Sequence, residues 1–287
     1  MAGKKRQSNK VFNSGAPEGM NMPGAPISNV MKDDFGLDIP HESVPLPSRG
    51  LCYPKDHPLH GVETVDVKPM TAREEDILTS RALIKKGTVI SHLIESCLID
   101  KSIRASDLLS GDRNALMVAL RITGYGSDYN VEVTCPECNS ASKFEFDLAE
   151  LPINRMGCEP ASPGENIFEY ELPYTKKQVK FKFLTGNDEE EIQRLESRRK
   201  KMGQLSDSIV TTRLQYAIVE IAGVTDRSKI NNFIRNMPAR DSRALRKYID
   251  EQEPGIEMSS WFDCTACGES SEVNVPLGAS FFWPDSE

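Results

Sequence analysis

Hydrophobic and polar positions alternate along two stretches of the chain, each of which begins just after a pair of cysteines. At six, eight and ten residues beyond the second cysteine of each pair the side chain is apolar: Phe144, Phe146 and Leu148 after Cys138, and Val273, Val275 and Leu277 after Cys267. A period of two is typical of a half-buried strand, because successive side chains of a strand point to opposite faces. Each cysteine pair is therefore predicted to lie in the tight turn of a β-hairpin.

Other stretches repeat their apolar positions every three to four residues, which indicates amphipathic helices. The clearest example has its apolar face at Ile90, Leu93, Ile94, Cys97 and Leu98, so Cys97 is expected in the core. Thr71 and Glu74 are spaced as a capping box, and a helix is expected to run from there to about residue 86. Further elements are predicted as helices over 111–123, 188–201, 210–221, 230–236 and 240–250, a strand over 62–67, and a hairpin over 168–183 that turns near Thr175. The fold class is α+β, with helices dominant.

The order of these elements occurs twice along the chain. Residues 112–120 share their pattern with residues 241–249, and this offset of 129 also relates Cys135 and Cys138 to Cys264 and Cys267. Upstream, residues 65–77 resemble 180–192 at an offset of 114 to 115, so the second copy carries roughly 14 extra residues, expected near 198–207. We interpret the pattern as a tandem duplication of a helical unit that ends in a zinc-knuckle β-hairpin. Chance alignment of common helix and strand patterns is the alternative.

The duplication divides the chain into three regions. Residues 1–45 are rich in Gly, Pro, Asn, Ser and Met and show no periodicity, so they are expected to form a flexible N-terminal arm. Such an arm either docks on a partner or is a plain solvated tail. Residues 46–150 form the first α+β copy with Cys135 and Cys138, and residues 151–287 form the second with Cys264 and Cys267.

Charge and composition restrict the function further. The formal net charge of −8 and the isoelectric point near 5.3 argue against a general nucleic-acid binder, which normally carries a basic face. Seven cysteines are too few for a disulfide scaffold, and the longest uninterrupted apolar run, 115–120, is far too short to span a membrane. The protein is therefore expected to be soluble in a reducing cytoplasm, without a membrane partner.

The cysteine pairs carry the strongest chemical signal. Two thiolates separated by two residues can reach one metal ion from one side, and a structural zinc ion needs four ligands in a tetrahedron. Cys135, Cys138, Cys264 and Cys267 are therefore predicted to hold one structural Zn²⁺ in a single zinc-ribbon-like site. The alternatives are redox-active or metal-free knuckles, although a thioredoxin-like pair lies after a strand at the start of a helix. A site with four protein ligands is closed, so it would stabilise the fold rather than catalyse a reaction.

The remaining candidate residues have weaker patterns. His57 and His60 could form a metal pair in a loop, but solvated side chains are the simpler expectation, and His92 is expected at the surface. The basic run 198–201 either contacts a phosphate or an acidic partner, or is a solvated helix end whose cations suit the helix dipole. Trp261 is expected in the core, and the aromatic segment 281–283 is an interface candidate.

The chain contains no pattern typical of an enzyme. A phosphate-binding glycine-rich loop, a nucleophile elbow and paired catalytic carboxylates at a meaningful spacing are all missing from the sequence. The sequence therefore predicts a non-enzymatic protein, without a catalytic residue or a small-molecule substrate.

Three segments together resemble a known family. PLPSRGLCYP at 45–54, VDVKPMTAREEDIL at 65–78 and VEVTCPECNSASKFEFDL at 131–148 are similar to the baseplate hub subunit and hub-assembly proteins of T-even-type contractile-tailed phages. The resemblance covers most of residues 40–150 and, more loosely, the second copy. It implies a structural protein made in the host cytoplasm and built into the virion tail baseplate, with other hub proteins and tail-tube proteins as partners. It transfers no catalytic residue.

Two other functions stay open at this point. One is an assembly factor that helps to form the hub but is absent from the finished virion. The other is a zinc-ribbon nucleic-acid-binding regulator, against which the acidic body of the chain argues.

Overall fold

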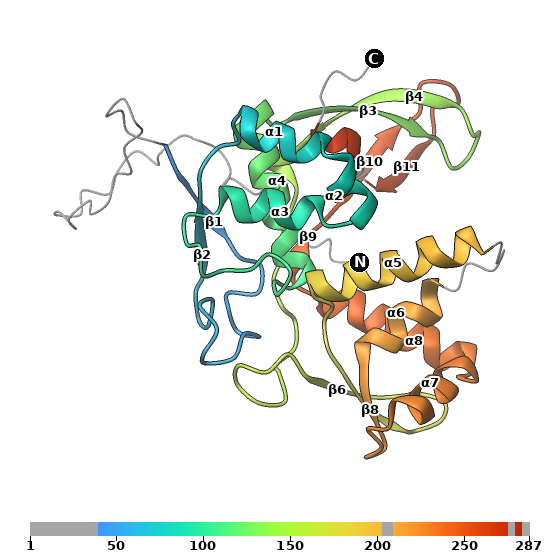
Figure 1. Cartoon of the computed structure of the whole chain (residues 1–287). Helices are drawn as coiled ribbons and strands as arrows, with labels where there is room; N and C mark the ends of the chain where they lie inside the picture. Colours follow the sequence, from blue (N-terminus) through green and yellow to red (C-terminus); the bar gives the residue numbers. More distant parts are fainter. Residues whose placement is uncertain (1–39, 203–208, 275–278, 283–287) are drawn as a thin grey trace, which may run out of the picture.

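The structure is a computed structural model that describes residues 40–202, 209–274 and 279–282. These residues form an α+β fold, which confirms the predicted class (Figure 1). Most of the expected arm, residues 1–39, lies outside the described residues, as do Val275, Leu277 and Trp283. No helix within the described ranges is long and apolar enough to cross a membrane.

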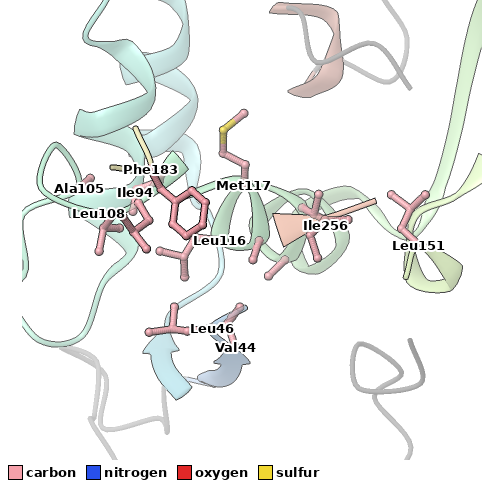
Figure 2. Packing of buried hydrophobic residues seen from close by; sticks show 14 of the residues in the cluster. Val44, Leu46, Ile94, Ala105, Leu108, Leu116, Met117, Leu151, Phe183 and Ile256 are labelled. Atoms are coloured by element: carbon pink, nitrogen blue, oxygen red, sulfur yellow. The ribbon is translucent and has the colours of Figure 1, made fainter. Parts of the chain in front are cut away.

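Helix α4 (Ser110–Tyr125) is the central element of the fold (Figure 1). Each residue of the apolar run 115–120 is buried, so the helix is surrounded by protein on all sides along its middle turns. It packs against elements from both halves of the chain, including β1, α3, α5 and β9. Figure 2 shows Leu116 of α4 close to Ile94 of α3 and to Phe183, which lies just before α5. The two halves therefore share one hydrophobic core.

The first half begins with two paired strands and continues into helices. The strands are antiparallel, with Val44 opposite Val65. The elements of this half, besides α4, are β1 (Glu42–Pro45), β2 (Thr64–Val67), α1 (Ala72–Thr79), α2 (Arg81–Lys86), α3 (Val89–Cys97), β3 (Asp128–Thr134), β4 (Ala141–Asp147) and the short 3₁₀ helix η2 (Leu148–Glu150).

Among the described residues, the second half has the same number of helices and three additional strands. Strands β6, β7 and β8 form an antiparallel sheet with β7 in the middle, whereas β5 pairs with β9 across the two halves. The elements are β5 (Ile153–Asn154), β6 (Phe168–Glu171), β7 (Gln178–Phe181), α5 (Gly186–Lys201), α6 (Ile209–Ala217), β8 (Ile218–Ile221), α7 (Arg227–Arg235), α8 (Ala239–Gln252), β9 (Gly255–Ile256), β10 (Ser259–Asp263), β11 (Ser270–Asn274) and η3 (Ala279–Phe282).

The same ion pair joins a strand to the following helix in each half. Lys68 Nζ donates to Glu74 at 2.9 Å, and Lys182 Nζ donates to Asp188 at 2.7 Å. The threonine three residues before each acid also donates its backbone N–H to that carboxylate, at 2.9 Å in both places. Each carboxylate thereby caps the first turn of its helix and fixes the angle between strand and helix.

A buried aspartate holds the opening loop of each half. Asp112, in the first turn of α4, accepts hydrogen bonds from the backbone N–H of Ser48 at 3.0 Å and from its hydroxyl at 2.6 Å. Asp241, in the first turn of α8, accepts from the backbone N–H of Thr175 at 3.1 Å and from its hydroxyl at 2.7 Å. Ser48 lies between β1 and β2, and Thr175 lies between β6 and β7, so each aspartate holds the loop that joins two antiparallel strands.

Several elements differ from the sequence-based expectations. The helix expected over 71–86 is two helices, because Ser80 has an extended backbone conformation with ψ of 103°. The helix expected over 210–221 ends at Ala217, and its last four residues form β8 against β7. Residues 42–45, assigned to the flexible arm, form β1 with Val44 fully buried. The other predicted helices occur within about three residues of their expected ends.

Arg121 anchors the end of α4 to the last described segment. Its side chain is 1 % exposed, and its Nε donates to the carbonyl of Phe281 at 2.9 Å. The other two nitrogens donate to the carbonyls of Gly126 at 2.7 Å and Asp128 at 3.1 Å. Three carbonyl acceptors compensate for burying the guanidinium, and the contact places η3 over the C-terminal end of α4.

The buried carboxylate of Glu74 makes stability depend on pH. Burial alone would raise its pKa, but hydrogen bonds from Ser96, Thr71 and Lys68 outweigh this effect and lower the pKa from 4.5 to about 2. Because the pKa falls on folding, the ionised group stabilises the protein above pH 4.5, and this contribution is lost as the pH falls towards 2. We expect Glu74→Gln to reduce the free energy of unfolding at pH 7 by about 2 kcal/mol.

Urea unfolding at several pH values measures this effect. The difference between wild type and Glu74→Gln should shrink steadily as the pH falls from 4.5 towards 2. Glu63→Gln, at an exposed position, serves as the control and should leave stability nearly unchanged. A Glu74→Gln difference that stays constant over this pH range would show that the carboxylate charge is not responsible.

Candidate metal centre

Two β-hairpins carry the four cysteines in matching positions. Strand β3 pairs with β4 so that Thr134 faces Ala141, and β10 pairs with β11 so that Asp263 faces Ser270. In each hairpin the first cysteine follows the first strand directly. The facing residues of the second hairpin lie 129 positions after those of the first. The prediction that each cysteine pair lies in a hairpin turn is confirmed for the described residues.

The two turns have the same hydrogen bonds. The backbone N–H of Asn139 donates to the carbonyl of Cys135 at 2.9 Å, and that of Gly268 donates to the carbonyl of Cys264 at 2.8 Å. Asn139 and Gly268 both have positive φ, of 57° and 73°. Glycine adopts this conformation without strain and asparagine tolerates it better than most residues, which explains the two residue types at this position.

The turns bring four thiol groups together. Cys135 Sγ lies 3.9 Å from Cys267 Sγ, and Cys138 Sγ lies 3.7 Å from Cys264 Sγ. All four sulfur atoms of this four-cysteine cluster lie within 4.8 Å of one another. A tetrahedral zinc site with Zn–S bonds of about 2.3 Å separates its sulfur atoms by about 3.8 Å. The spacing therefore fits zinc, whereas a disulfide needs its sulfur atoms about 2.05 Å apart.

The cluster is buried on one side and open on the other. Cys135 and Cys264 are buried, while Cys138 and Cys267 are exposed. All seven cysteines are free thiols, and the other three lie outside the cluster. Burial raises the pKa of the Cys97 thiol to about 12, so that residue is a core side chain, as its helical position predicted.

Ser140 is a polar neighbour of the cluster that the sequence pattern did not indicate. Its hydroxyl lies 2.9 Å from Cys138 Sγ and 3.4 Å from Cys264 Sγ, so it contacts one cysteine of each hairpin. This contact lowers the pKa of both thiols, and that of Cys264 reaches about 6. At Cys267 the backbone of Glu269 lowers the pKa, but contacts with Cys138 and Cys264 outweigh it and raise the pKa to about 12.

Side chains beyond the cysteines also join the two hairpins. The ring of Phe144 in β4 meets that of Phe262 in β10 edge to face, with the centroids 5.4 Å apart. Near the turns, the hydroxyl of Ser142 lies 3.2 Å from that of Thr265. The hairpins therefore contact each other through these side chains, and the cluster lies where their turns meet.

The geometry of the four-cysteine cluster fits a structural metal site. Zinc with four cysteine ligands has no open position for water or a substrate. Zinc bound here would connect two hairpins that are far apart in the sequence. Cys138, the last cysteine of the first pair, and Cys264, the first of the second pair, are 126 positions apart. Closing such a long loop reduces the conformational freedom of the unfolded chain, which favours the folded state.

The histidine candidates remain outside this site. His57 stacks on Tyr53 with the ring centroids 4.7 Å apart, and His60 Nδ1 lies 2.6 Å from the carbonyl of Tyr53. These contacts organise a loop and correct the expectation that both side chains are merely solvated. His92 is exposed, as predicted.

The two aromatic candidates have the opposite exposure to the one predicted. Trp261, predicted in the core, is 52 % exposed, because Phe262 takes the inward position in β10 and neighbouring strand residues face opposite ways. Phe281 and Phe282, predicted at an interface, are 0 % and 1 % exposed. Phe281 packs edge to face on Tyr129 at 5.2 Å, so this segment belongs to the core.

Comparisons with known proteins identify a family. The family described as "T4 bacteriophage base plate protein" matches residues 52–283, a range that includes all four cysteines of the cluster. No curated protein sequence and no solved structure matches the chain.

Proposed function

The chain belongs to the T4 bacteriophage base plate protein family, and we propose that it is a non-enzymatic structural component of the baseplate hub, stabilised by one structural zinc ion. The family match over residues 52–283 carries this proposal. A structural role in the phage baseplate implies contacts with other baseplate components. The finer assignment to the hub, with hub and tail-tube proteins as neighbours, rests on the resemblance of residues 45–54, 65–78 and 131–148.

The proposed zinc ion is bound by Cys135, Cys138, Cys264 and Cys267. Sulfur separations of 3.7 and 3.9 Å between the hairpins support this proposal, because they are close to the edge of a zinc tetrahedron, about 3.8 Å. Each hairpin supplies two ligands, so neither could complete the site alone. The role of the ion is to fix the first half of the chain to the second.

We also propose that the two halves arose by tandem duplication. Three sets of contacts support this: the Lys–acid pairs at 68/74 and 182/188, the buried aspartates at 112 and 241, and the cysteine turns. Each contact in the first half has its counterpart 114 or 129 residues later, although the residues around the two contacts differ. In this scheme the first copy covers residues 46–150 with β1 added at its start, and the second covers residues 151–287.

Mass spectrometry of purified tails tests the proposed role directly. We expect the protein in intact tails and virions at a fixed ratio to the other baseplate proteins. Tails assembled without it should lack infectivity, because a structural part of the hub would be missing. Repeated detergent and salt washing controls for loosely adsorbed protein.

The same measurement separates the assembly-factor alternative. A protein that is present in infected cells and in baseplate precursors, but missing from washed tails, would act during hub assembly only. In that case the structural proposal is wrong, while the family assignment and the zinc site are unaffected. Location in the host cytoplasm during assembly is common to both functions.

A further inference from the structure

Helices α2 and α5 come from different halves of the chain (Figure 1). A pocket lined by basic side chains lies between them. Its volume is about 170 Å³. Five of its lining residues are basic and none is acidic: Lys85, Lys86, Arg194, Arg198 and Lys201. We refer to these five residues as the basic pocket. It contains two members of the basic run 198–201 noted in the sequence.

Few of these charges are neutralised within the protein. Arg194 forms an ion pair with Glu190 at 3.5 Å. Lys85, Lys86, Arg198 and Lys201 have no carboxylate within 4 Å among the described residues. This concentration of positive charge lies on a chain whose formal net charge is −8.

Helix dipoles explain only part of the pattern. Lys85 and Lys86 lie in the last turn of α2, and Arg198 and Lys201 lie in the last turn of α5, where the dipole favours cations. Arg194 lies two turns before the end of α5, beyond the range of that effect. The dipoles also give no reason for the two helix ends to face the same pocket. The like charges repel each other there, and a bound anion would reduce this repulsion.

We propose that the basic pocket binds an acidic segment of another baseplate protein, with neighbouring Asp or Glu side chains that enter between α2 and α5. Arginine and lysine at this density recognise carboxylates through charge-assisted hydrogen bonds. The identity of the partner as a baseplate protein rests on the proposed function, whereas the acidic chemistry rests on the pocket alone.

The shape and lining of the pocket favour a peptide over a nucleic acid. Single-stranded nucleic acid is usually bound along an extended basic groove with aromatic side chains on which bases stack. The basic pocket is compact, and its other lining residues are Ile84, Gly87, Gln193 and Ser197, so it offers no aromatic ring. The formal net charge of −8 would also repel a long polyanion.

Binding at this position would also connect the two halves of the chain. The backbone carbonyl of Lys86 accepts a hydrogen bond from Arg194 Nε at 3.5 Å, the upper limit for such a contact. An acidic side chain between the helices would interact with both at once. The partner would therefore stabilise the arrangement of α2 and α5, in addition to occupying the surface.

Fluorescence polarisation with a labelled hexaglutamate peptide tests the proposal on the full-length protein. The pocket variant is Lys85→Glu/Arg198→Glu, with one change from each helix. The control variant, Lys55→Glu/Lys229→Glu, has the same change in net charge at exposed positions outside the pocket. We expect the pocket variant to bind the peptide about tenfold or more weakly, and the control to bind nearly as well as wild type. Thermal unfolding should show that both variants fold.

A second probe decides the chemical class of the ligand. Labelled oligothymidylate with the same number of negative charges should bind the wild-type protein more weakly than hexaglutamate. Tighter oligothymidylate binding that is lost in the pocket variant would overturn the proposal in favour of nucleic acid. No hexaglutamate binding by wild type, or equal weakening in both variants, would also overturn it. Hexaglutamate binding as expected, in a protein that is absent from purified tails, would contradict only the baseplate identity of the partner.

Discussion

Cys264→Ser protein is expected to lose nearly all bound zinc, while the wild-type chain binds about one ion. Cys135→Ser should lose zinc to a similar extent, because each hairpin supplies two of the four ligands. Since the free energy of metal binding contributes to folding, both variants should unfold several degrees below wild type. Elemental analysis of the purified proteins measures the zinc, and calorimetry measures the unfolding temperature.

Cys158→Ser is the matched control for these variants. Cys158 is a half-buried free thiol outside the four-cysteine cluster, so its replacement should leave the zinc content unchanged. Removing zinc from the wild-type protein with a chelator should reproduce the stability loss of Cys264→Ser. The shared site would be falsified if wild type bound two zinc ions per chain, or if Cys264→Ser retained its full zinc content.

Gly111→Ala is expected to destabilise the fold by about 3 kcal/mol or more, because a side chain at this position has no space. A Cβ atom on Gly111 would lie 1.7 Å from the carbonyl oxygen and 2.7 Å from the carbonyl carbon of Pro254. Both are backbone atoms of the residue just before β9, so they cannot move aside as a flexible side chain would. The start of α4 would have to separate from β9, and with it the contact between the two halves. Urea unfolding measures the change.

Gly124→Ala in the same helix is the control. A Cβ atom there would meet only the terminal methyl group of Met70 within 3 Å, at 2.6 Å, and methionine adapts its conformation readily. Alanine also favours helix over glycine by about 1 kcal/mol, so stability should stay close to wild type. If the two variants were equally stable, the close approach of α4 to Pro254 would not be a constraint of the fold.

Local patterns in the sequence predicted most of the regular elements correctly. The apolar face at 90–98 and the capping box at Thr71 and Glu74 depend on residues only three or four positions apart, so they can be recognised without the rest of the chain. The cysteine hairpins were predicted for the same reason. In addition, two equal cysteine spacings followed by the same alternation indicated that the hairpins act as a pair.

Elements that depend on distant partners were not predicted. Residues 218–221 continue the apolar period of the preceding helix, but their main chain pairs with β7 instead. Strand β1 lies at the end of a segment without periodicity and is defined by pairing with β2. The burial of Phe281 depends on Arg121, which is 160 positions away. A local pattern of apolar residues does not indicate which distant segment a residue will contact.

Two features of the sites could not be predicted from the sequence, because they also depend on residues far apart in the chain. Ser140 contacts Cys264 across 124 positions, and a serine beside a cysteine pair has no distinctive spacing. The basic pocket combines residues of α2 with the basic run at the end of α5. The sequence indicated the run, but only the fold shows that Lys85 and Lys86 face it.

The separation of the cysteine pairs also determines when the cluster can form during protein synthesis. Cys135 and Cys267 are 132 positions apart, so a ribosome that adds 5 to 20 residues per second makes the second pair roughly 7 to 26 s after the first. During this interval the two thiols of the first hairpin lack the two thiols that complete the cluster. A chain that stops before Cys264 can never complete the cluster. The cluster, and with it the link between the two hairpins, can therefore form only in chains that extend to Cys267.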